Sequence, residues 1–282
     1  MAFDWAIKHE RSTFADKLAY ALREGMLALA SANLAALKVL LTKGWRPATQ
    51  LVSHNYKLYS GFGLNGLPLD VPWRTECTLP SLPPDEIFRD IDFSHSPPLI
   101  FPKPTALSIS TLELIILCQL IRAMKPDRVI EFGTATGRTA ANLAANLPPG
   151  SELITVDIPE GSSNGKWLYL ELGADVLGRI KQLECDLTTY DWSTYRRSAG
   201  IVFCDACDTP KPFAKETELA FDLVTDNGII LWHDYGYSRF RTKALNKLGT
   251  LMPVWNIAGT NLACVHVTPS AKIAIQGTLL TN

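Results

Sequence analysis

The sequence is poor in features that would assign it to a simple class. Cysteine is scarce, with six residues in 282, which is too few for a disulfide framework in a chain of this length. A surplus of one charge is also lacking, because 27 basic residues face 28 acidic ones and the net charge is −1. No general positive field exists that would gather nucleic acid, so we expect no nucleic-acid partner.

Long apolar runs are absent as well. The most apolar early stretch, 26–37, has 12 residues and is followed by Lys38, whereas a bilayer crossing needs about 20. The first residues are charged and contain no apolar signal core. We therefore expect no stable membrane insertion. Because the cysteines do not form a disulfide framework, we expect them to be reduced and the protein to be cytoplasmic.

The composition, 47% apolar and 20% charged, is that of a globular protein. The distribution of proline along the chain indicates two regions. Nine of the 18 prolines fall between Pro68 and Pro104, in a stretch without periodicity. We expect an N-terminal helical and proline-rich extension or lid over 1–106, and a second domain over 107–282. Within the extension, apolar spacing predicts a helix over 12–43, which could cover the main domain or pair two copies into a homo-oligomer.

Regular segments alternate from residue 108 onward. The pattern Ser110-Thr-Leu-Glu113 is a capping box and predicts a helix over 114–124. Strands and helices then alternate; the strands are predicted at 128–132, 153–156, 180–183, 200–204, 228–232, 254–257 and 262–267, and the helices at 138–147 and 212–224. This order predicts an α/β fold, a Rossmann-like, doubly wound and mostly parallel seven-stranded sheet with an antiparallel C-terminal strand.

Polar side chains follow the predicted strands at their carboxyl ends, where such sheets bind ligands. These residues are Glu131, Asp157, Asp186, Asp205, His233 and Asp234. Their occurrence at several strand ends indicates a ligand site more strongly than any one of these residues does.

A glycine-bounded turn, Gly133-Thr-Ala-Thr-Gly137, joins the first of these strands to a helix. Its G-x-x-x-G spacing differs from the G-x-G-x-x-G of dinucleotide sites. Asp157 lies 20 residues after Gly137, at the end of the next strand, where an acid can accept hydrogen bonds from ribose hydroxyls. A plain tight turn and a strand-end acid are the structural alternatives.

At this point the sequence resembles a known family. Residues 129–137 and 154–157 are similar to motif I and the following acidic motif of the class I S-adenosylmethionine-dependent methyltransferases, within a match over about 108–267. Ala135 replaces the middle glycine of the usual motif. The resemblance implies that S-adenosylmethionine contacts seven residues: Glu131, Gly133, Thr134, Gly137, Asp157, Asp186 and Asp205. For Asp186 a loop or capping role is the alternative.

Residues 201–205 and 228–235 resemble the O-methyltransferase-like branch, methyltransferase family 24 and the catechol O-methyltransferase-like enzymes. The resemblance implies a site for Mg²⁺ or another divalent cation formed by Asp205, His233 and Asp234, although His233 suits a softer metal or a general base better. Asp208 stands where the family often has histidine, so Asp208 and His233 are the candidate catalytic bases. A helix-capping role for Asp208 stays open.

The function implied by the resemblance is methyl transfer to a hydroxyl of a small-molecule acceptor such as a sugar, polyketide or phenol. The alternatives are an NAD-dependent oxidoreductase and a catalytically idle cofactor-binding subunit. Two smaller questions also stay open. Trp232 and Tyr235 could line the acceptor pocket or belong to the core, and four arginines could form a basic patch for nucleic acid: Arg196, Arg197, Arg239 and Arg241.

Overall fold

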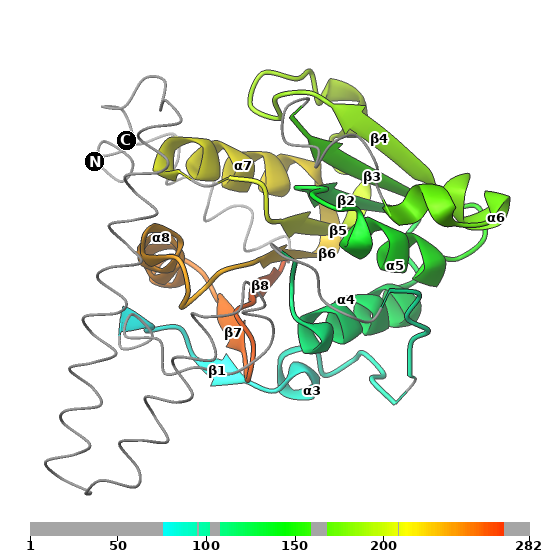
Figure 1. The fold of residues 1–282 in the computed structure, drawn as a ribbon. Coiled ribbons are helices and arrows are strands. Elements are labelled where there is room, and N and C mark those ends of the chain that lie inside the picture. The colour runs from blue at the N-terminus through cyan, green and yellow to red at the C-terminus, as the bar shows by residue number, and fades with distance from the viewer. Residues whose placement is uncertain (1–75, 95, 102–107, 159–167, 208, 268–282) are drawn as a thin grey trace, which may run out of the picture.

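The computed structural model describes residues 76–94, 96–101, 108–158, 168–207 and 209–267 (Figure 1). The predicted helix over 12–43, most of the predicted extension and Asp208 lie outside the described residues.

One eight-stranded sheet organises the described chain, in the order β1-β7-β8-β6-β5-β2-β3-β4. Its strands are β1 (Ser81–Leu82), β2 (Arg128–Phe132), β3 (Glu152–Asp157), β4 (Ile180–Glu184), β5 (Ala199–Cys204), β6 (Val224–Trp232), β7 (Trp255–Ile257) and β8 (Ala263–His266). Only the pairings of β8 are antiparallel among the described strands. The predicted fold class is confirmed, and all seven predicted strands are present.

The eighth strand was not expected. β1 lies in the proline-rich stretch, where the sequence shows no periodicity, and it pairs in parallel with β7 at the sheet edge. A two-residue strand is too short to leave a periodic signal in the sequence. The short helix α3 (Pro84–Ile87) follows it.

Helices cover both faces of the sheet (Figure 1). On one face lie α4 (Thr111–Met124) and α5 (Arg138–Asn146), and on the other α7 (Pro210–Leu223) and α8 (Arg239–Gly249). The shorter helical segments are η2 (Leu168–Glu171), α6 (Ala174–Leu177) and η3 (Ser193–Tyr195). Helix α8 is absent from the sequence-based prediction.

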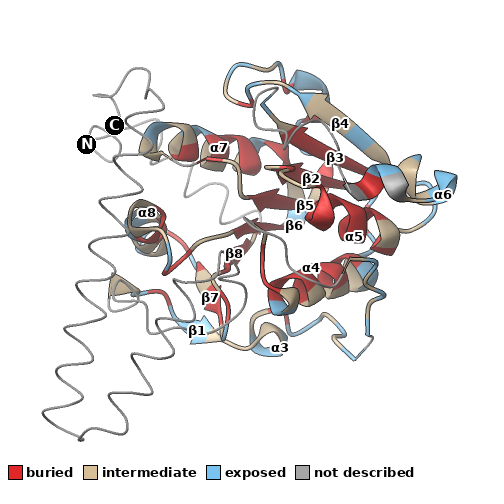
Figure 2. Ribbon diagram, in the orientation of Figure 1, coloured by how far each residue is buried: buried red, intermediate tan, exposed pale blue. Residues whose placement is uncertain are grey.

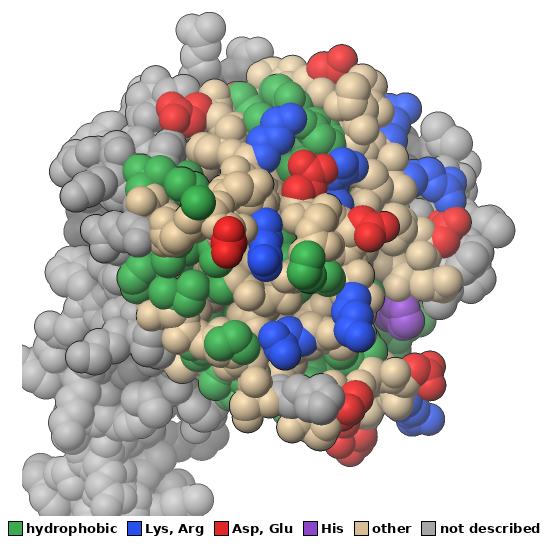
Figure 3. Space-filling view, turned by 90° about the vertical axis from the view of Figure 1, so that its right-hand side faces the viewer, with side chains coloured by type: hydrophobic (Ala, Val, Ile, Leu, Met, Phe, Trp, Pro, Cys, Tyr) green, Lys and Arg blue, Asp and Glu red, His purple; other side chains and the backbone are tan. Residues whose placement is uncertain are grey.

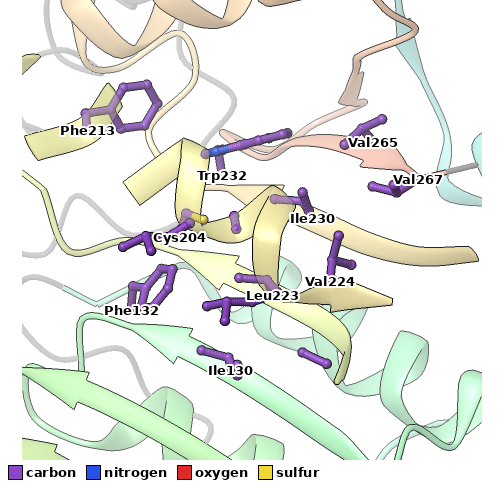
Figure 4. Packing of buried hydrophobic residues seen from close by; sticks show 14 of the residues in the cluster. Ile130, Phe132, Cys204, Phe213, Leu223, Val224, Ile230, Trp232, Val265 and Val267 are labelled. Carbon is purple, nitrogen blue, oxygen red and sulfur yellow. The ribbon is translucent and has the colours of Figure 1, made fainter. Parts of the chain in front are cut away.

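Alternate residues of the central strands supply two cores. In β2, Val129 faces the core under α4 and α5, whereas Ile130 and Phe132 face the one under α7 (Figure 4). The central strands are therefore buried on both sides, which explains their continuous apolar runs (Figure 2).

The capping box at the start of α4 is present as predicted. The hydroxyl oxygen of Ser110 accepts a hydrogen bond from the backbone N–H of Glu113, at 3.1 Å, and Oε2 of Glu113 accepts one from the N–H of Ser110, at 2.8 Å. This exchange satisfies two donors at the helix start and fixes the direction of the Glu113 side chain.

Two aromatic residues whose role the sequence left open belong to the core. Trp232 is fully buried on β6 (Figure 4), and Tyr235 is 2% exposed. The Tyr235 hydroxyl accepts hydrogen bonds from the N–H groups of Thr78 and Leu79, both at 3.0 Å, and donates one to Oδ1 of Asn246 at 2.7 Å. It therefore fastens the segment before β1 to α8.

The four arginines of the candidate basic patch all lie beside acidic side chains. Arg196 faces Asp222, Arg197 pairs with Asp226, and Arg239 pairs with Glu76. Arg241 is buried. Acidic and basic side chains are mixed on the face in Figure 3. None of the helices in the described ranges has both the length and the apolar character that a bilayer crossing requires.

Candidate functional site

The loop between β2 and α5 is built on left-handed backbone. Gly133, Ala135 and Gly137 have φ of +97°, +46° and +76°. Two hydrogen bonds hold the loop: the N–H of Gly133 donates to the carbonyl of Val156 on β3 at 2.8 Å, and within the loop the N–H of Gly137 donates to the carbonyl of Thr134 at 2.7 Å. Left-handed backbone costs Ala135 about 1–2 kcal/mol, which the middle glycine of the usual motif would avoid.

Asp157 compensates for that strain. Its Oδ2 accepts a hydrogen bond from the N–H of Ala135 at 2.8 Å, and its Oδ1 accepts one from the N–H of Ile158 at 2.9 Å. Each carboxylate oxygen has a further lone pair, so Asp157 can fix the loop and still accept from a bound ligand.

Gly133 brings this loop against the end of β5. A Cβ atom added to Gly133 would stand 2.6 Å from the carbonyl oxygen of Asp205. The glycine is therefore required for two reasons, the positive φ and the close approach. As a result, the loop directly adjoins the polar group that follows β5 and β6.

Glu131 and Thr134 belong to a buried hydrogen-bonded chain. The hydroxyl of Thr155 donates to Oε2 of Glu131 at 2.5 Å and lies 2.7 Å from the hydroxyl of Thr134, which also accepts from the Gln182 amide at 3.1 Å. Because its hydroxyl is used internally, Thr134 can offer a ligand its backbone only. This differs from the direct side-chain contact that a binding threonine would give.

Burial raises the pKa of Glu131 to about 8, against the opposing effect of the hydrogen bond from Thr155. Its Oε1 is buried without a hydrogen-bond partner among the described residues. At neutral pH the side chain is therefore largely the neutral acid.

Asp186 follows β4 and is exposed. Its Oδ1 accepts hydrogen bonds from the N–H of Thr188, at 2.8 Å, and from the Thr188 hydroxyl, at 2.6 Å. The capping alternative is thus present in the structure, and a contact to adenine stays a prediction.

Asp205, His233 and Asp234 come together as predicted. One candidate ligand atom from each lies within 4.8 Å of the others. Nδ1 of His233 is 3.2 Å from Oδ1 of Asp205 and 3.1 Å from Oδ1 of Asp234. Asp234 has a φ of +65°, a left-handed conformation that asparagine and aspartate adopt more readily than most residues.

Two charged residues that sequence reasoning did not place in the site complete this group. Oε2 of Glu113 lies 3.4 Å from Nε2 of His233. Nη1 of Arg241 lies 3.3 Å from Oδ1 of Asp205 and 3.5 Å from Oδ2 of Asp234. We call these five residues the charge cluster. The capping box revealed the position of Glu113 but not its target, and nothing in the sequence distinguishes Arg241 from its neighbours on α8.

The cluster fixes the charge of its members. Although burial opposes ionisation, the carboxylates of Asp205, Asp234 and Glu113 raise the pKa of His233 well above its ordinary value. Burial likewise opposes the charge of Glu113 and Asp234, but His233 lowers both pKa values to about 2. At neutral pH His233 is therefore an imidazolium with a carboxylate at each ring nitrogen.

The residue types suit a divalent cation, but their arrangement does not. A histidine ligand needs a bare ring nitrogen, and both nitrogens of His233 face carboxylates. A cation bound to Oδ1 of Asp205 would lie within about 6 Å of the Arg241 guanidinium. Repulsion at that distance is on the order of 5 kcal/mol for an effective dielectric constant of about 20.

Comparison with known proteins identifies the domain. Residues 130–235 match a family model described as a methyltransferase domain, of methyltransferase family 24. This range contains the glycine loop and three members of the charge cluster. No curated protein matches the chain at a significant level.

Several solved structures resemble the fold at low identity. The O-methyltransferase TomG from Streptomyces achromogenes, solved with S-adenosylmethionine, is 18% identical, with a TM-score of 0.45 over 72% of this chain and 92% of its own. The Podospora anserina methyltransferase PaMTH1, bound to S-adenosylhomocysteine, is 18% identical, with a TM-score of 0.45 over 57% and 80%. The Bacillus cereus O-methyltransferase, also bound to S-adenosylhomocysteine, is 16% identical, with a TM-score of 0.45 over 57% and 84%.

Among the described strands the sheet has a single antiparallel strand, β8, which lies between β6 and β7. The predicted resemblance is confirmed: residues 130–235 match the methyltransferase domain family.

Proposed function

We propose that this protein transfers the methyl group of S-adenosylmethionine to a hydroxyl oxygen of a small molecule. One observation carries the proposal, the contact between the backbone of Gly133 and the carbonyl of Asp205. Through it the predicted cofactor loop adjoins the charge cluster, so a cofactor on the loop would present its methyl group close to ionised side chains. Both parts lie inside the region that matches the methyltransferase family.

The cofactor contacts follow from the geometry of the loop. The second lone pairs of the Asp157 oxygens can accept hydrogen bonds from the ribose hydroxyls, while Gly133 and Gly137 allow close approach of the backbone. A contact between Glu131 and the methionine part stays a prediction, because its Oε1 is buried within the protein. Thr134 contributes by holding the loop.

The transfer itself needs placement and a proton acceptor. The acceptor oxygen forms a bond to the methyl carbon as the carbon–sulfur bond breaks, S-adenosylhomocysteine leaves, and the hydroxyl proton passes to a base. His233 is protonated at neutral pH, so it does not serve as that base there. We assign the role to Asp205, whose part-buried carboxylate follows β5 directly beside the glycine loop. Asp208, outside those residues, stays the predicted alternative.

This assignment favours an acidic hydroxyl. Any carboxylate is a weak base compared with an alkoxide. The imidazolium of His233 and the guanidinium of Arg241 would stabilise a neighbouring oxyanion. Phenols and enolic polyketides lose their proton far more readily than sugar alcohols. Of the predicted acceptor classes, we therefore propose phenols and enols ahead of sugars.

Calorimetric titration with S-adenosylhomocysteine, and with NADH for comparison, tests the cofactor. We expect micromolar affinity for the first and no binding of the second. Asp157→Ala should weaken the affinity at least about tenfold, since hydrogen bonds to a charged group contribute about 1.5–3 kcal/mol each. Asp191→Ala is the control. It removes an exposed carboxylate outside the loop, which accepts a hydrogen bond from the N–H of Ser193 at 2.9 Å, and it should leave the affinity for S-adenosylhomocysteine unchanged.

Either of two results would refute the proposal. Binding of NADH alone would favour the oxidoreductase alternative, which the family match does not support. Binding of S-adenosylhomocysteine without turnover of any phenol, enol or sugar in an acceptor panel would favour the idle subunit.

A further inference from the structure

Arg241 holds the position between two carboxylates that a metal ion would need. Its Nη1 lies 3.3 Å from Oδ1 of Asp205 and 3.5 Å from Oδ2 of Asp234. With Nδ1 of His233 near Oδ1 of both residues, three of the four carboxylate oxygens already face a nitrogen. A guanidinium stays charged at any pH at which the protein is folded, so this pairing is permanent.

Arg241 is also held in place by groups outside the carboxylates. Its Nη2 donates a hydrogen bond to the carbonyl of Cys207 at 2.7 Å, and its Nη1 lies 3.3 Å from the carbonyl of His233. The guanidinium carbon lies 5.7 Å from the ring centre of Phe213 and 6.0 Å from that of Phe240. The side chain is 2% exposed. These contacts hold the guanidinium in its position between the two carboxylates.

We propose that the guanidinium of Arg241 takes the place of a divalent cation, so the site works without a metal. Arg241 is then a positioning residue: it holds Asp205 and Asp234 apart from each other at fixed directions and supplies the local positive charge. The same side chain keeps metal ions out. The consequence for catalysis rests on the proposed function, whereas the exclusion of metal does not.

The test measures metal binding without cofactor or acceptor. Mn²⁺ is titrated into the full chain and free Mn²⁺ is followed by electron paramagnetic resonance. We expect no binding by the wild type below 1 mM, on the order of the weakest protein sites for hard cations. Arg241→Met removes the charge at similar length and should gain at least tenfold in Mn²⁺ affinity. The added substitution Asp205→Asn should abolish that gain.

Two controls separate the role of charge from general disturbance. Arg239→Met alters the same helix at a residue that pairs with Glu76 instead, and should leave Mn²⁺ binding at the wild-type level. Arg241→Lys keeps one positive charge and should still exclude Mn²⁺. Thermal unfolding shows which variants are folded. If Arg241→Met does not fold, the Mn²⁺ titration of the wild type still tests whether the site excludes metal.

The outcomes are distinct. Wild-type binding of Mn²⁺ at micromolar concentration, lost in Asp205→Asn, would overturn the proposal. Failure of a folded Arg241→Met variant to gain affinity would overturn the part assigned to Arg241. Methyl transfer that is unchanged by EDTA would extend the result to catalysis, while absence of any methyl transfer would count against the proposed function alone.

Discussion

The backbone at Gly133 lies so close to Asp205 that a Cβ atom on residue 133 would stand 2.6 Å from the carbonyl oxygen of residue 205. This contact joins the loop after β2 to the end of β5. It therefore sets the distance between the predicted cofactor loop and the charge cluster. A side chain at 133 would have to move one part away from the other.

Gly133→Ala should accordingly reduce both stability and cofactor binding. Overpacking against backbone together with a φ of +97° should lower the free energy of unfolding by about 2–4 kcal/mol. Gly150→Ala is the matched control, because Gly150 has a φ of +85° but nothing within 4 Å of an added Cβ. It should cost only about 1 kcal/mol. Urea unfolding and S-adenosylhomocysteine titration of both variants check this, and equal losses would refute the close contact.

Glu131 should make the protein less stable as the pH rises. Its pKa is raised to about 8, against 4.5 for an unperturbed glutamate, so between those values the folded state holds a proton that the unfolded state has released. The penalty is absent below about pH 4.5, grows with pH, and is complete above pH 8.

Glu131→Gln removes this penalty. The variant should match the wild type near pH 5 and exceed it in free energy of unfolding by at least about 1 kcal/mol at pH 8.5, while it binds S-adenosylhomocysteine more weakly. Denaturant unfolding at the two pH values measures the difference. A variant equally or less stable than the wild type at pH 8.5 would show that Glu131 is not held as the neutral acid.

Tyr235→Phe should loosen the segment that leads into β1. The hydroxyl accepts from the N–H groups of Thr78 and Leu79, and its loss leaves a buried N–H of Leu79 without that acceptor. We expect a loss of about 1–3 kcal/mol in the free energy of unfolding and faster amide exchange at 78–82. Exchange measured by mass spectrometry would contradict this if 78–82 were as protected as in the wild type.

The sheet could be predicted from the sequence because its signals are local. The runs at 128–132 and 228–232 are mainly apolar and are followed by Gly133 or by His233-Asp234, and the parallel order then brings Asp205, His233 and Asp234 to one edge. The capping box of Ser110 and Glu113 is likewise a short-range pattern.

The contacts across the sheet edge could not be predicted in the same way. Glu113 and His233 are 120 positions apart in the sequence, and they meet because α4 packs beside β6 and the turn before β8. Arg241 lies on α8, whose pattern did not indicate a helix, and its charge suggested a surface position. Only the fold shows that its guanidinium lies between the part-buried carboxylates of Asp205 and Asp234.

Glu113→Gln should release the charge of His233. Oε2 of Glu113 lies 3.4 Å from Nε2 of His233, and Oε1 accepts the N–H of Asn261 at 2.7 Å. A neutral amide has a single acceptor oxygen, so it keeps the N–H of Ser110 or that of Asn261 but not both, and it no longer stabilises the imidazolium. We expect the pKa of His233 to fall towards its ordinary value while the folded structure is kept.

An NMR titration of the histidine ring signals, with His233→Gln to assign the resonance, measures this fall. Ser110→Ala is the control, since it removes the other half of the capping box, costs about 1 kcal/mol, and leaves the contact between Glu113 and His233 in place. The difference in free energy of unfolding between the wild type and Glu113→Gln should depend on pH through the charge of Glu113. The pKa of Glu113 is lowered to about 2, so its contribution is complete above about pH 4.5 and is lost as the pH falls towards 2. If His233 titrates alike in the wild type and in Glu113→Gln, then Asp205 and Asp234 alone hold its charge, and Glu113 is only the cap of α4.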